Sequence, residues 1–63
     1  MKMFVWEDAI DVGYGGSVVV AVAETLDEAR ALARQKAGPL ANLGEPDAIL
    51  DLPVAYVYGV GGL

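Results

Sequence analysis

Residues 17–39, SVVVAVAETLDEARALARQKAGP, decide the fold, because one run holds a strand, a helix start and a helix stop. The valine-rich segment 17–23 favours a strand. Thr25 and Glu28 match a capping box, in which the two residues satisfy each other's amides at a helix start. The closing Gly-Pro pair ends a helix. We therefore predict a helix over about 26–37.

Two further strands are predicted on either side of this run. Residues 2–7, KMFVWE, are apolar on both faces, so this strand needs cover on both sides and belongs at the centre of the sheet. Residues 54–58, VAYVY, alternate as a third strand does. Residues 48–50 are a candidate for a short edge segment, broken before Pro53. A right-handed crossover then places the third strand beside the first, in order 3-1-2, with both neighbours antiparallel to the first.

The predicted fold class is α+β: a ββαβ two-layer sandwich with a mainly antiparallel three-stranded sheet and one helix on one face. The 63 residues form a single domain, 1–63, in which 59–63 is a glycine-rich tail with little reason to be ordered alone. A chain this short buries only about 60% of its unfolded surface. It usually needs further stabilisation by disulfides, a metal or a partner subunit. Cysteine and histidine are both absent, so we expect oligomerisation to supply this stability.

The helix stripe is mostly alanine and covers one sheet face only. Depending on register, the bare face carries either Phe4 and Trp6 or Met3 and Val5 of the first strand, together with valines or alanines of the second and the two tyrosines of the third. Leaving several such groups in water costs about 1.5–3 kcal/mol each, and soluble monomers rarely expose such patches. We expect a second copy of the chain to cover this face; the alternative is that residues 39–53 fold back as a lid. The residues expected at this dimer or partner face are Phe4, Trp6, Tyr56 and Tyr58.

The charge balance argues against several partners. The net charge is −5 with only four basic residues, and an acidic surface repels nucleic acid and anionic lipid. No apolar run approaches the roughly 18 residues of a membrane span. We expect a cytoplasmic protein without direct nucleic-acid or membrane binding. The basic residues on the predicted helix are interpreted as a solvated face near its C-terminus.

The residues that carry chemistry are sparse. Ser17 has no general base beside it, and the carboxylates form two separate groups without a recognised metal-ligand pattern, so no enzyme activity, metal or cofactor is expected. The two glycine clusters do not feed a helix N-terminus, which argues against a nucleotide pocket. The glycine pair before Leu63 is not terminal, unlike that of ubiquitin-like carriers. We expect a loop to be the partner-binding site, through Glu7, Asp8, Asp11 and Tyr14.

Three features together resemble a loose group of short phage and prophage proteins of unknown function. These are the opening FVWED at 4–8, the capped helix after a valine-rich strand, and the closing VYGVGG at 57–62. The tail departs from the group at Val60 and Leu63, which interrupt a plain glycine run. The resemblance implies a phage setting, in which proteins of this size often inhibit host enzymes or defence systems, CRISPR complexes included.

The sequence therefore predicts a small acidic binding protein, dimeric, that acts as a phage-type accessory or anti-defence inhibitor by binding a host protein or sequestering a small ligand. A structural reading remains open, in which the chain is a component of a larger assembly and its sheet a permanent interface. An enzymatic reading would require a metal held by carboxylates.

Overall fold

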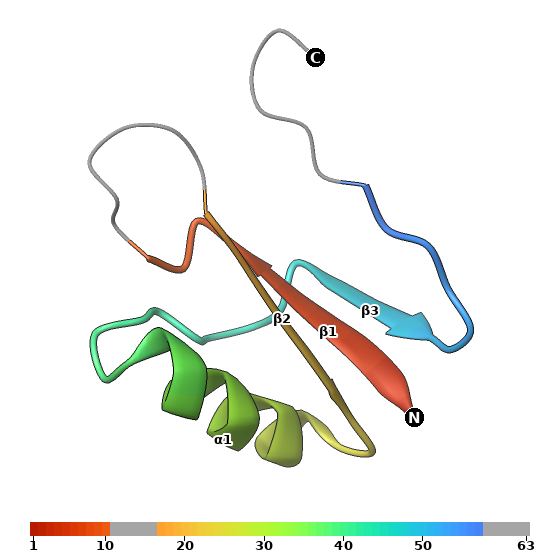
Figure 1. Ribbon diagram of the computed structural model, residues 1–63, viewed down its shortest axis with the longest axis horizontal. Helices are drawn as coiled ribbons and strands as arrows, with labels where there is room; N and C mark the ends of the chain where they lie inside the picture. Colours follow the sequence, from red (N-terminus) through yellow and green to blue (C-terminus); the bar gives the residue numbers. More distant parts are fainter. Residues whose placement is uncertain (11–16, 58–63) are drawn as a thin grey trace, which may run out of the picture.

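The computed structural model describes residues 1–10 and 17–57, and it confirms the predicted α+β sandwich (Figure 1). A single helix packs against a three-stranded sheet, with most contacts to one edge strand. The elements follow the order strand, strand, helix, strand: β1 (Lys2–Glu7), β2 (Val18–Ala23), α1 (Leu26–Ala37) and β3 (Ala48–Asp51).

The sheet has the order β2-β1-β3, which is the predicted order read from the opposite edge. Both neighbours run antiparallel to β1, as predicted. Val5, at the centre, lies opposite Val20 on one side and Ala48 on the other. The strand that is apolar on both faces therefore occupies the only position with a neighbour on each side.

The prediction of the third strand at 54–58 is wrong. The strand that pairs with β1 is Ala48–Asp51, and residues 54–57 are not in a strand, while Tyr58 lies outside the described residues. The backbone N–H of Asp47 donates to Val5 O at 2.7 Å and starts this pairing immediately after the loop. A strand of four residues is too short to show a clear alternation, so the stronger pattern that follows it was misleading.

The helix begins and ends where the sequence predicts. The Thr25 hydroxyl accepts from the Glu28 amide at 3.2 Å and donates to Glu28 Oε1 at 3.1 Å, so the glutamate binds the cap hydroxyl instead of the cap amide. At the other end the Gly38 N–H donates to Arg34 O at 3.0 Å. The alanines Ala29 and Ala33 are the buried residues of the helix and allow close approach to β2.

The main core lies between the helix and the sheet. Phe4 and Trp6 of β1 project into it, with ring centroids 6.4 Å apart. Small side chains of β2 and α1 complete this layer, together with two residues of the loop after the helix, Ala41 and Leu43. Phe4 and Trp6 thus face α1, which has room for them because its own stripe is alanine.

The loop 38–47 fills the part of this layer that the helix does not reach (Figure 1). Trp6 Nε1 donates to Gly44 O at 3.0 Å, which anchors the loop beneath β1. The alternative of a lid formed by 39–53 over the bare face is therefore wrong: the loop covers the sheet on the helix side, and residues 48–51 belong to the sheet itself.

The opposite face carries Met3, Val5 and Glu7, which alternate with the core residues of β1. Val5 is fully buried, and the Tyr56 hydroxyl donates to Glu7 Oε2 on the same face. The segment after β3 therefore returns across this face. What remains exposed there is mainly the row of valines on β2.

Gly38 is the residue whose conformation most restricts substitution. Its φ of 95° and ψ of 173° belong to a region that is essentially reserved for glycine, although an added Cβ would meet nothing within 4 Å. We expect Gly38→Ala to lower the free energy of unfolding by about 1–3 kcal/mol through backbone strain alone. Urea denaturation checks this; Gly44→Ala, without a positive φ, is the control and should cost clearly less.

Candidate binding surfaces

Two acidic segments that are separate in the sequence meet at one end of the sheet. Asp47 Oδ2 accepts from the Glu7 backbone N–H at 2.7 Å, which joins the end of β1 to the start of β3. Asp8 follows Glu7 and Glu45 precedes this contact, and both are exposed. Within the described residues none of these four carboxylates forms an ion pair. The acidic end, as we call Glu7, Asp8, Glu45 and Asp47, therefore projects uncompensated negative charge.

The predicted loop site is only partly described. Glu7 is half-buried, and its carboxylate is occupied by Tyr56, whereas Asp8 is exposed with a φ of 58°. Asp11 and Tyr14 lie outside the described residues. The sequence did not predict that Glu45 and Asp47 join this group, because only the antiparallel pairing of β3 with β1 brings the two segments together.

The predicted partner face is wrong for its two largest residues. Phe4 and Trp6 are 3% and 1% exposed, because the register turns them toward the helix. Tyr56 is half-buried on the opposite face, and Tyr58 lies outside the described residues. The sequence left the register open, and the even-numbered residues of β1 were placed on the wrong side. Homodimerisation itself stays a prediction.

The basic residues of the helix do not form a free strip. Arg30 donates to Leu43 O and Gly44 O, both at 2.9 Å. Arg34 Nη1 lies 2.6–3.1 Å from three carbonyl oxygens of the same loop, which share its two N–H groups. Both guanidinium groups therefore fasten the loop to the helix, and Lys36 is the helix cation left in solvent.

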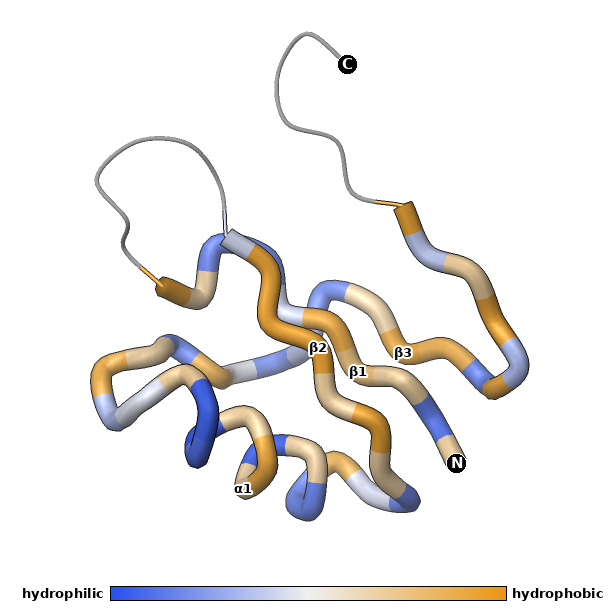
Figure 2. The backbone as a smooth tube through the Cα atoms, viewed as in Figure 1, coloured by the Kyte–Doolittle hydropathy of each residue, from blue (hydrophilic) through white to orange (hydrophobic). Residues whose placement is uncertain are grey.

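The largest group of exposed apolar side chains in the sheet lies on β2, although Ile49 of β3 is individually more exposed. Its residues alternate strictly, with Val19, Ala21 and Ala23 buried against the helix side. The other row, called the valine row below, consists of Val18, Val20 and Val22, which are 37%, 46% and 41% exposed. Figure 2 shows β2 as a largely hydrophobic stretch of the backbone. The predicted strand order already placed this strand at an edge, but the sequence left open which of its two rows of side chains faces the helix.

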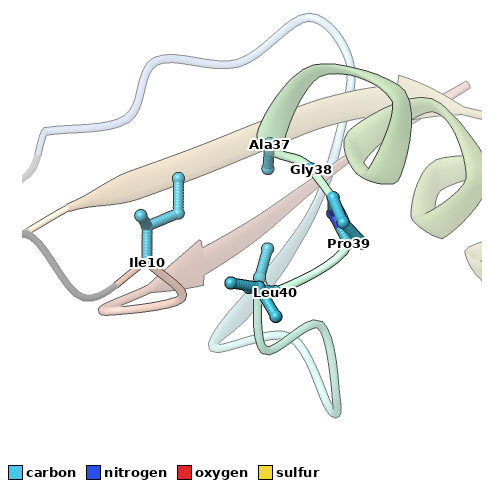
Figure 3. A pocket seen from close by; sticks show the side chains of 6 residues that line it. Ile10, Ala37, Gly38, Pro39 and Leu40 are labelled. Atoms are coloured by element: carbon cyan, nitrogen blue, oxygen red, sulfur yellow. The ribbon is translucent and has the colours of Figure 1, made fainter.

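A small apolar pocket of about 370 Å³ lies where the helix ends (Figure 3). All of its lining residues are apolar: Ile10, Ala37, Gly38, Pro39, Leu40 and Ala41. Leu40 is 96% exposed at its rim. No charged side chain lines it, so it lacks the convergent polar groups that orient a substrate.

The described residues contain no group of three or more carboxylates placed to hold a metal ion. Within the same residues, no helix is long and apolar enough to cross a membrane. In comparisons with known protein families, curated proteins and solved structures, none matches this chain.

Proposed function

We propose that the chain is a non-catalytic binding protein that docks its acidic end on a basic surface of another protein. The observation that carries the proposal is the convergence of Glu7, Asp8, Glu45 and Asp47 at one end of the sheet without an ion pair among the described residues. Complementary charge steers association and suppresses wrong partners.

The fold holds this end in a defined shape. The Glu7 amide is bound to Asp47, the Glu7 carboxylate to Tyr56, and the Asp8 N–H donates to Ser17 O at 2.8 Å. Carboxylates that are positioned before binding lose less conformational freedom on binding than mobile ones do. The resemblance to short phage proteins supports an inhibitor of a host protein as the biological role within this proposal.

The test is a pull-down from lysate of the producing cells at low and high salt. The variant Asp8→Asn with Glu45→Lys raises the net charge of the acidic end by three units. Asparagine tolerates the positive φ of Asp8. The control, Asp51→Asn with Glu24→Lys, makes the same charge change at the opposite end of the sheet. We expect a salt-sensitive partner that the control retains and the variant loses.

Equal capture by both variants, or no specific partner at low salt, would contradict the proposal. Circular dichroism should show both variants folded, because all four substituted residues are exposed.

A further inference from the structure

We propose that the outer edge of β2 binds an extended strand of a partner protein, which adds a fourth strand to the sheet. The site is separate from the acidic end and does not rest on the function proposed for it. Three features of the described residues carry the inference: the chemistry of this edge, the helix flank beneath it, and the charges at its two ends.

The two edges of the sheet differ in how well they resist pairing. β3 has four residues, ends at Asp51 and is followed by Pro53, and short strands, charges and prolines all discourage edge-to-edge association. β2 has six residues, VVVAVA, with no charge, proline or glycine. A long, uncharged, β-branched edge is a template for a further strand.

The helix supplies a surface against which one face of that strand can pack. Arg30 and Arg34 project from the flank of α1 that faces the loop beneath β1. Leu32 lies on the opposite flank and is 47% exposed. Because the helix packs against β2, this flank extends past the sheet edge, where it would underlie a fourth strand. In Figure 1, β2 lies between α1 and the other strands.

This arrangement favours a strand without its own helix over a second copy of the chain. Symmetric antiparallel pairing of two β2 strands keeps both helices on the same face of the joined sheet. The paired strands would be about 4.8 Å apart, and each helix lies under its own β2. Packed helices need about 8–10 Å between their axes. The two helices would therefore collide, whereas an isolated strand brings no helix and meets only the flank of α1 that holds Leu32.

The charges on this flank define the chemistry of the strand. Glu28 and Lys36 lie one helical turn before and after Leu32, and both are exposed. The helix returns alongside β2, so Glu28 lies near the end of β2 and Lys36 near its start. A complementary strand running antiparallel to β2 carries a basic residue near its beginning, apolar residues at alternate positions, and an acidic residue near its end.

The test uses the full chain and the peptide acetyl-Lys-Thr-Val-Thr-Val-Thr-Glu-amide as the probe. Two further peptides carry N-methyl groups on either the odd or the even amides, because only one of these sets can face β2 in an antiparallel ladder. Binding is followed by amide chemical shifts and hydrogen exchange. We expect shifts centred on residues 18–23, slowed exchange there, and loss of binding with one methylated peptide but not the other.

Variants locate the peptide on the surface. We expect Leu32→Glu to weaken binding about tenfold or more, since it replaces an apolar contact with a charge that must be desolvated. Leu40→Glu alters an even more exposed leucine away from β2 and should leave the affinity unchanged. The acidic-end variant should also bind the peptide normally, so this test and that of the proposed function fail independently.

Three results would overturn the inference. These are no binding at millimolar peptide, equal binding of both methylated peptides, and a stable homodimer in light scattering that Leu32→Glu dissociates. The last result would assign the surface to a second copy.

Discussion

Replacing Trp6 with alanine is expected to unfold most of the chain at room temperature. Trp6 is the largest fully buried side chain, with 1% of its surface exposed. Truncating a buried tryptophan to alanine costs about 3–5 kcal/mol. At about 0.05–0.15 kcal/mol per residue, a domain of 63 residues has only about 3–9 kcal/mol of stability. The loss therefore equals the whole stability over the lower half of that range, and far-ultraviolet circular dichroism should show the unfolding.

The variant Trp6→Phe separates packing from hydrogen bonding. Phenylalanine keeps most of the apolar volume but loses the donor to Gly44 O, which still accepts from Arg30 Nη2. We expect a folded protein with a free energy of unfolding lowered by about 1–3 kcal/mol. A fully stable Trp6→Ala protein would contradict the position of Trp6 in the core. The fluorescence of the single tryptophan also tests its burial in the wild-type protein. Its emission should be blue-shifted in the folded protein and red-shifted in urea.

Local chemistry explains which parts of the fold were predictable. The helix of 26–37 followed from Thr25 and the Gly-Pro stop, which act within a few residues of the backbone they organise. The central position of β1 followed from a composition that is apolar on both faces. The third strand could not be recognised in the same way, because Ala48–Asp51 is short and is fixed by pairing with a segment more than forty residues away.

Register explains why the candidate surfaces were only partly predictable. The sequence limits each face of β1 to either the even or the odd residues, but it does not state which row meets the helix. The alanine stripe of α1 leaves space for Phe4 and Trp6, and the Trp6 ring also finds its acceptor, Gly44 O, on that side. Once this choice is made, the exposed apolar surface moves to the valine row. The acidic end likewise needs β3 in place before its two segments meet.

The second large effect is expected at the two helix arginines. Arg30 and Arg34 together donate hydrogen bonds to five carbonyls between Gly38 and Gly44. Hydrogen bonds to charged groups contribute about 1.5–3 kcal/mol when shielded, and the exposure of Arg34 lowers its share. We expect the double variant Arg30→Met with Arg34→Met to lose about 2–4 kcal/mol of stability, measured from the midpoint of urea denaturation.

Lys36→Met is the matched control for this pair. It removes a cation from the last turn of the same helix, but Lys36 makes no hydrogen bond or ion pair with the described residues, so its effect should stay below about 0.5 kcal/mol. If the double variant were no less stable than Lys36→Met, the arginines would be solvated surface charges, as the sequence alone suggests. Because Arg30 and Trp6 share Gly44 O, their single losses should also be non-additive in a double-mutant cycle. Such coupling would show that the loop, the helix and the central strand are held together at one carbonyl.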